Sequence, residues 1–215
     1  MKFQAKLRNG KDIPDLGQVQ CARRRTLRAL AVCLFLLLLF HRTSWVETSP
    51  LPYILVSSGI FLIAIAICGR IWTRIYLGER KRTHFVYDGP YSLVRHPLYM
   101  FSIIGAAGVG AQTQSLAIMA AVTLLVWFLL QRTAKIEEAD MTARFGEAYR
   151  SYAAERYRFW PRFSLWKQGR RANIDYAILA DTLVDSSWFA LAPVVLWLLR
   201  LAHAEHLIPW LFQTP

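Results

Sequence analysis

The chain has 215 residues, of which 55% are hydrophobic, and its formal net charge is +12. Long apolar runs exclude an ordinary soluble domain and a disordered chain, and nucleic-acid binding would explain the charge without explaining those runs. A polytopic, all-α membrane protein explains both properties, because basic residues gather in the loops on the cytoplasmic side of a membrane. The three cysteines are far apart and show no disulfide or metal-ligand spacing, so no metal site is expected.

Five transmembrane helices are predicted in chain order. The first covers residues 27–46 and the second covers 51–69, which hold no charged side chain. A helix over that second run would reach about 28 Å, close to the hydrocarbon core of about 30 Å. Residues 97–131 also lack a charged side chain, and the polar stretch AQTQS interrupts them at 111–115. They predict a helical hairpin of two spans with a tight turn, and residues 183–201 predict the fifth span.

The distribution of Lys and Arg agrees with this topology. Residues 1–28, 70–96 and 132–180 hold 8, 6 and 10 of the chain's 26 basic residues. All three segments then lie on the cytoplasmic side, with the amino terminus inside and the carboxyl terminus on the opposite face. The membrane is predicted to be either a bacterial inner membrane or the endoplasmic reticulum. No nucleic acid partner is needed to explain the charge, and the sequence sets no oligomeric state.

Four parts of the chain are predicted to have different tasks. They are a cytoplasmic basic lead-in (1–28), two transmembrane helices (29–70), a core with the hairpin and its cytoplasmic flanks (71–163), and a cytoplasmic linker with the last helix (164–215). The hairpin brings both of its ends to the same face of the membrane. The stretch Arg95-His96-Pro97 and the pair Glu137-Glu138 are therefore expected to be neighbours, although about 40 residues separate them.

The residues at the mouth of the hairpin suit the binding of a charged ligand. Pro97 fits the first turn of a helix, and Arg95 and His96 then lie at a helix start whose free N–H groups favour an anion. Glu137 and Glu138 follow the apolar run of the second arm by one to two turns. Because adjacent residues on a helix point about 100° apart, at most one of the two carboxylates is expected to face the site.

The segment 132–163 predicts a helix that leaves the membrane, breaks near Phe145-Gly146, resumes through Tyr149 and Tyr152, and stops at Pro161. This segment contains Tyr149, Tyr152 and Tyr157. Together with Tyr91 and Tyr99, these tyrosines offer flat surfaces that could bracket a base or a cation. Three of its arginines are expected to face lipid headgroups: Arg144, Arg150 and Arg156.

No glycine-rich phosphate loop and no serine or cysteine nucleophile motif is present, which disfavours nucleotide hydrolysis and acyl-enzyme chemistry. The stretch GPYSLVRHPLY, followed by EEADMTARFGEAYRSYAAERYRFWP, resembles the isoprenylcysteine carboxyl methyltransferase family and its phospholipid methyltransferase relatives. These are polytopic membrane enzymes that use S-adenosylmethionine and release S-adenosylhomocysteine. The resemblance covers residues 85–163 at these positions: Gly89, Tyr91, Arg95, His96, Pro97, Tyr99, Glu137, Glu138, Phe145, Gly146, Tyr149, Tyr152, Arg158, Phe159 and Pro161.

The resemblance implies a role for most of these side chains. Arg95 and Glu138 would be catalytic, and Arg95 and Arg158 would contact a lipidic or small apolar acceptor that carries a carboxylate, thiol or amine. The acceptor would enter from the bilayer. The implied cofactor-binding residues are Tyr91, His96, Pro97, Tyr99, Glu137, Glu138, Tyr149 and Tyr152.

Two departures from the family pattern concern the identity of the substrate more than the use of the cofactor. Phe101 stands where the family often has glycine, and Met141 replaces the leucine of E-E-x-x-L. Sterol reductases, which use a nicotinamide cofactor, carry a similar R-H-P-N-Y-x-G motif, but Leu98 replaces its asparagine here. An NADPH-dependent, sterol-reductase-like enzyme and a non-catalytic membrane relative are therefore the alternatives to a methyltransferase.

Overall fold

The computed structural model describes residues 16–43, 49–77, 86–168, 176–209 and 212–214. Helices dominate these ranges, as the composition and the apolar runs predicted. The helices are α1 (Leu16–Leu39), α2 (Leu51–Leu77), α3 (Pro90–Leu93), α4 (Pro97–Ala111), α5 (Leu116–Phe145), α6 (Glu147–Glu155), the short 3₁₀ turn η2 (Phe163–Leu165) and α7 (Tyr176–Ala204). Two short parallel strands, β1 (His41–Thr43) and β2 (Phe212–Thr214), pair the segment after α1 with the segment after α7.

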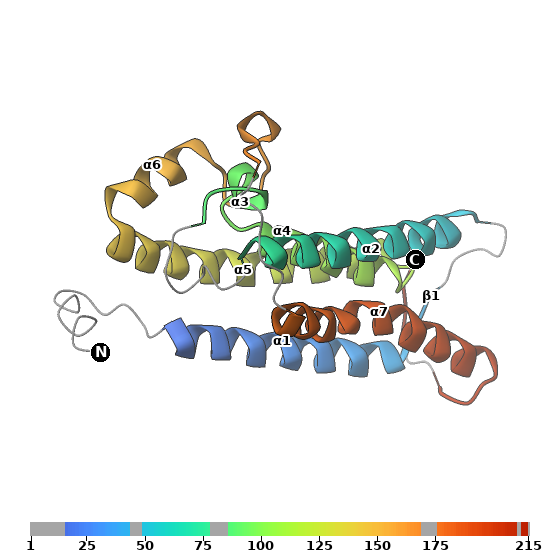
Figure 1. Cartoon of the computed structure of the whole chain (residues 1–215). Helices are drawn as coiled ribbons and strands as arrows, with labels where there is room; N and C mark the ends of the chain where they lie inside the picture. The colour runs from blue at the N-terminus through green and yellow to red at the C-terminus, as the bar shows by residue number, and fades with distance from the viewer. Residues whose placement is uncertain (1–15, 44–48, 78–85, 169–175, 210–211, 215) are drawn as a thin grey trace.

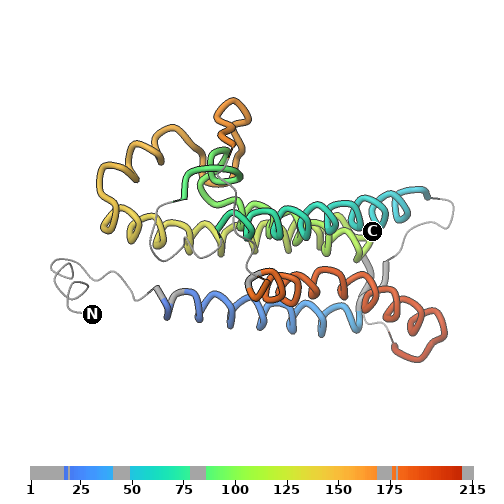
Figure 2. Tube along the Cα trace, viewed as in Figure 1, coloured from blue at the N-terminus to red at the C-terminus, as the bar shows by residue number. Residues whose placement is uncertain are grey.

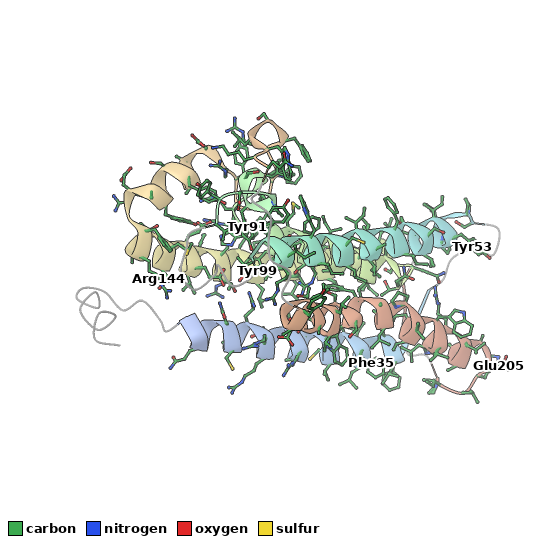
Figure 3. The ribbon with its side chains drawn as sticks, in the orientation of Figure 1. Phe35, Tyr53, Tyr91, Tyr99, Arg144 and Glu205 are labelled. Carbon is green, nitrogen blue, oxygen red and sulfur yellow. The ribbon has the colours of Figure 1, made fainter. Side chains whose placement is uncertain are left out.

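The long helices lie side by side along one common direction (Figures 1 and 2). Helix α4 packs against α2 and α5, and α7 packs against α2. The start of α1, the end of α2 and the end of α5 lie toward one end of the bundle, where α3 and α6 are also found. Figure 3 places Tyr91, Tyr99 and Arg144 toward this end, and Tyr53 and Glu205 at the other. The chain therefore alternates in direction, as a polytopic protein requires.

Among the residues that the structure describes, three helices are long and apolar enough to cross a membrane: α2, α5 and α7. Helix α4 is apolar but has only 15 residues, which reach about 22 Å, less than a hydrocarbon core of about 30 Å. Helix α1 is not one of these helices, and its first 13 residues carry Arg23, Arg24, Arg25 and Arg28. The structure thus supports three of the five predicted crossings, and the full number stays a prediction.

The predicted hairpin is present and is tightly packed. Helix α4 ends at Ala111 and α5 starts at Leu116. Ser115 caps the start of α5, where its side chain accepts a hydrogen bond from the Ile118 N–H at 3.5 Å. Gly108 of α4 lies against Gly59 of α2, and a Cβ atom on either glycine would lie 2.8 Å from the carbonyl oxygen of the other. The small residues of α4 therefore permit the close helix approach that the sequence indicated.

Several helix boundaries differ from the predicted ones. Helix α2 continues to Leu77, beyond the predicted end at residue 69, so Arg70 and Arg74 lie on a helix and not in a loop. The break at Gly146 is confirmed: this residue has φ +56°, a conformation that glycine adopts easily. Helix α6 ends at Glu155, before the predicted stop at Pro161, because the backbone of Arg156 is already extended.

Candidate functional site

The candidate site begins where two segments of extended backbone run next to each other. The Arg95 N–H donates to the Tyr157 carbonyl at 3.0 Å, and the His96 N–H donates to the Arg158 carbonyl at 3.1 Å. His96 is the residue before the first turn of α4, and the buried Pro97 occupies the first helical position, as expected. The backbone thus fixes Arg95, His96 and Arg158 together at the mouth of α4.

Glu138 is the centre of this cluster. Arg158 donates to it through two nitrogen atoms, with Nε 2.9 Å from Oε1 and Nη2 2.6 Å from Oε2. His96 Nε2 lies 3.1 Å from Oε1 and Arg95 Nη1 lies 3.3 Å from the same oxygen. The hydrogen bond to Glu138 raises the pKa of the Arg158 guanidinium above its ordinary value. Since only 12% of the Glu138 side chain is exposed, water screens these contacts weakly.

Glu137 also faces the cluster. It accepts a hydrogen bond from the Tyr99 hydroxyl at 2.7 Å, and its Oε2 lies 3.7 Å from His96 Nδ1. The His96 ring stacks on the Tyr99 ring, with centroids 5.4 Å apart. The expectation that at most one carboxylate would face the site is therefore wrong. Adjacent glutamates do diverge, but the two nitrogens of one imidazole ring each lie near a different one.

Helix α1 contributes two residues that the sequence did not single out. Arg23 donates to the Tyr99 hydroxyl, and its guanidinium carbon lies 5.1 Å from the centroid of the Tyr99 ring. The amide nitrogen of Gln20 lies 3.5 Å from Glu137 Oε1. No motif marks these residues, and the only signal was the basic cluster at 23–25, which the topology alone explained.

The remaining tyrosines support the cluster from one side. The Tyr152 hydroxyl donates to the Tyr91 carbonyl at 2.7 Å, and the rings of Tyr149 and Tyr152 are 5.9 Å apart. Burial raises the pKa of Tyr91, Tyr149 and Tyr152 well above the ordinary value of a phenol, so all three stay neutral. Tyr157 is exposed. The contact of Tyr152 with the Tyr91 backbone fastens α6 to α3, and Tyr149 and Tyr152 are both buried there.

Arg156 corrects the expectation that it faces lipid headgroups. It is only 5% exposed, its Nε donates to the Ser92 carbonyl at 2.9 Å, and its guanidinium carbon lies 4.5 Å from the centre of the Tyr152 ring. Because the backbone turns extended at Arg156, the side chain returns toward α3. Arg144 and Arg150 are exposed, and their contact with lipid headgroups stays a prediction.

Phe101 fills the position where the related enzymes often have glycine. Its side chain is buried against Gly69 of α2, and its ring centroid lies 6.5 Å from that of Trp72. The departure at this position is therefore accommodated by a glycine on the facing helix.

The groups of this cluster can be matched to those of a ligand that carries a carboxylate, an ammonium group and a cationic centre. The Nε atom of Arg95 is buried and has no hydrogen-bond partner among the described residues, so a donor remains for an anionic group. Glu137 and Glu138 supply acceptors for ammonium or hydroxyl groups, and Tyr99 supplies an aromatic face. These residues fit S-adenosylmethionine. In the part of the chain that the structure describes, no group of His, Cys, Asp and Glu could hold a metal ion.

The phospholipid methyltransferase family profile matches residues 51–148, from α2 to the start of α6. The cobalt-zinc-cadmium resistance protein CzcN of Cupriavidus metallidurans is 32% identical over 166 residues, which cover 77% of this chain and 76% of that protein. The chain belongs to the phospholipid methyltransferase family. The resemblance to this family and to isoprenylcysteine carboxyl methyltransferases is thereby confirmed.

A second relative in this group is the nickel-cobalt-cadmium resistance protein NccN of Alcaligenes xylosoxydans xylosoxydans. It is 28% identical over 188 residues, which cover 87% of each chain. No solved structure matches the chain. The likeness to these two proteins therefore includes residues beyond the 51–148 range of the family profile.

Proposed function

We propose that this phospholipid methyltransferase family member is an integral membrane, S-adenosylmethionine-dependent methyltransferase with S-adenosylhomocysteine as its product. The acceptor is a lipidic or small apolar molecule with a carboxylate, thiol or amine. The observation that carries the proposal is the paired carboxylates, Glu137 and Glu138, both turned toward His96 at the mouth of α4. Arg95 adjoins them with an unsatisfied buried donor.

The chain's own residues would bind and orient the reactants. Arg95 would hold a carboxylate through its free Nε, and Glu137 or Glu138 would accept hydrogen bonds from ammonium or hydroxyl groups. His96, Pro97 and Tyr99 would form the flat wall of the site, with Tyr91, Tyr149 and Tyr152 behind it. The cofactor supplies a methyl group on a sulfonium centre. Because methyl transfer is an in-line displacement, positioning and the exclusion of water would supply most of the catalysis.

Arg158 would position Glu138 in addition to the acceptor contact that the resemblance implies. Two of its nitrogens contact Glu138, and Nη1 donates to Gln131 Oε1 at 2.8 Å. This fork holds the carboxylate in one orientation. The catalytic pair of this proposal is therefore Arg95 and Glu138, with Arg158 as the residue that aligns them.

The distribution of basic residues supports a cytoplasmic site. The amino terminus and the cluster around Glu138 would lie on the cytoplasmic face, with the carboxyl terminus on the other face. Both named relatives come from bacteria, which favours the bacterial inner membrane over the endoplasmic reticulum. The four-part division of the chain, with residues 71–163 as the catalytic core, belongs to the same proposal.

Calorimetric binding to the detergent-purified protein tests the cofactor. We expect S-adenosylmethionine and S-adenosylhomocysteine to bind and NADPH to give no heat. Arg95→Ala should weaken the binding of both ligands by about 10-fold or more, because it removes a charge-assisted hydrogen bond. The matched control is Arg150→Ala on α6, where the side chain is 66% exposed. Binding of NADPH alone would favour a reductase, and silence from all three ligands in folded protein would favour a non-catalytic relative.

The names of the two relatives favour a second, cellular function. We propose that methyl transfer by this chain contributes to resistance against cobalt, zinc, nickel or cadmium. The test is the growth of a strain without the chain on each metal, with complementation by the wild type and by Arg95→Ala. Rescue by the wild type alone would link metal resistance to the site around Arg95. Rescue by the wild type and by Arg95→Ala alike would show that resistance does not depend on this site.

A further inference from the structure

Two arginines of α2 lie one turn apart inside the bundle. Arg70 and Arg74 belong to one of the three helices that could cross a membrane. Arg70 is seven residues before the end of α2 at Leu77, about 10 Å along the helix axis. Because the uncharged run of α2 ends at residue 69, Arg70 would lie at the edge of the hydrocarbon core, where a charged side chain needs a partner.

The partners of Arg70 are neutral hydroxyl groups. Its Nη1 donates to Ser102 Oγ of α4 at 2.6 Å, and its Nε donates to Ser186 Oγ of α7 at 3.3 Å. The guanidinium carbon lies 5.6 Å from the centroid of the Phe189 ring on α7. The side chain is therefore held between three helices. An arginine that merely reaches for the water layer would not make these contacts.

The positive charge of Arg74 is also poorly balanced by its neighbours. Its Nη2 lies 3.6 Å from Asp185 Oδ2, beyond the usual length of a hydrogen bond, and the Asp185 side chain is 60% exposed. The Nε of Arg74 is buried and has no hydrogen-bond partner in the described part of the chain. Arg23 and Arg74 both repel the charge of Arg70, while Asp185 attracts it. Arg70 therefore has two positive neighbours, Arg23 and Arg74, and one negative neighbour, Asp185.

We infer that Arg70 and Arg74, with Ser102 and Ser186, form a site between α2, α4 and α7 for the phosphate of an anionic membrane lipid. Arginine suits this ligand, because its planar fork matches phosphate oxygens and it keeps its charge near the bilayer. The Ser186 hydroxyl accepts from Arg70 and can add a donor, whereas the Ser102 hydroxyl already donates to the Leu98 carbonyl at 2.8 Å and only holds Arg70 in place. Ser186 of α7 lies beyond residues 51–148, so the family profile includes three of these four residues but not this one.

The site lies close to the carboxylate cluster. Ser102 follows Tyr99 by three residues on α4, about one helical turn, and Arg23 contacts the Tyr99 ring while it repels Arg70. An anion bound to Arg70 and Arg74 would relieve this repulsion. The lipid would therefore also stabilise the packing of α1 and α7 next to the site of methyl transfer.

Lipid binding to the purified protein in detergent tests this inference. The probes are a short-chain phosphatidylglycerol, phosphatidylcholine of the same chain length, and inorganic phosphate. We expect phosphatidylglycerol to bind and raise the melting temperature, with phosphatidylcholine at least about 10-fold weaker because it has no net charge. Equal binding of the two lipids would overturn the inference. Inorganic phosphate that binds as tightly as phosphatidylglycerol would make the ligand a free anion and would overturn the lipid assignment.

Variants locate the site. Arg70→Gln and Arg74→Gln should each weaken phosphatidylglycerol binding by about 10-fold, because each removes a charge-assisted contact. Arg150→Gln is the matched control, since it removes the same charge from an exposed position on α6. Arg74→Gln guards against misfolding, because this substitution breaks one long ion pair, the 3.6 Å contact of Arg74 with Asp185. Unchanged lipid binding in both α2 variants would overturn the inference.

Binding of S-adenosylmethionine, measured on the same preparations, separates this inference from the proposed function. If Arg70→Gln and Arg74→Gln bind S-adenosylmethionine normally but lose phosphatidylglycerol, the anion site is supported and the proteins are folded. If the wild type binds phosphatidylglycerol selectively but not S-adenosylmethionine, only the proposed methyltransferase function fails.

Discussion

Two groups of arginines in this molecule are compensated in opposite ways. Arg95 and Arg158 share the carboxylate of Glu138, with contacts of 3.3 Å and 2.6 Å. Arg70 instead bonds two serine hydroxyls, and Arg74 has one distant carboxylate. The first group balances its charge within the chain, so its geometry is set before any ligand arrives. The second group keeps excess positive charge, so we expect its geometry to depend on a bound anion.

The largest effect should come from removing the shared carboxylate. Glu138→Ala leaves Arg95, Arg158 and His96 without their common partner in a poorly screened place. Methyl transfer should fall by about 100-fold or more, and the melting temperature should drop by several degrees. Glu147→Ala is the control, because Glu147 is exposed on α6. Equal losses in both variants would show that the charge of Glu138 matters and its position does not.

A smaller effect is expected when the fork that holds Glu138 is replaced by a point charge. Arg158→Lys keeps the charge but loses the bidentate contact and the hydrogen bond to Gln131. Transfer should slow by about 10-fold, with little change in melting temperature. The control is Arg144→Lys, an exposed partner of Asp140. A fully active Arg158→Lys would mean that charge alone aligns Glu138.

The contact between α6 and α3 predicts a change in stability. Arg156→Ala removes a buried guanidinium that donates to the Ser92 carbonyl and packs on the Tyr152 ring. Unfolding should become easier by about 2 kcal/mol, because a buried acceptor loses its donor. Thermal unfolding measures this loss. Arg150→Ala, which breaks an exposed pair with Glu147, should change stability by no more than about 0.5 kcal/mol.

The smallest effect concerns α1 and separates two ligands. Arg23 lies over the ring of Tyr99, where it competes with any cation that the ring would attract. Arg23→Ala should therefore tighten S-adenosylmethionine by about threefold and leave the neutral S-adenosylhomocysteine unchanged. Arg24→Ala, at an exposed position on the same helix, should change neither. If Arg23→Ala instead binds both ligands more weakly, Arg23 contributes to binding and does not compete with the cation.

Features with local signals could be predicted from the sequence. The polar stretch 111–115 gave the hairpin turn, and Gly146 gave the break between α5 and α6. Because a hairpin returns to the face where it started, the meeting of His96 with Glu138 followed from the topology. The length of α2 could not be predicted from its apolar run, since the helix continues through Arg70 and Arg74, whose partners lie on α4 and α7.

Contacts between distant segments without a motif were not predictable. The reach of Arg23 to Tyr99 depends on how α1 packs, and nothing near Arg23 in the sequence specifies that packing. The inward turn of Arg156 depends on a backbone that becomes extended one residue after α6. The position of Glu137 has a different reason. Adjacent glutamates on a helix diverge, but each nitrogen of the His96 ring lies near one of the two carboxylates.

Helix α5 runs without interruption from Leu116 to Phe145 (Figure 1). Its 30 residues reach about 45 Å, well beyond a hydrocarbon core of about 30 Å, so one rigid rod joins the bilayer to Glu137 and Glu138. A bilayer of different thickness changes the tilt of such a rod, and the tilt moves both carboxylates relative to His96. We therefore expect the acyl-chain length of the surrounding lipids to affect the position of Glu137 and Glu138 without any ligand.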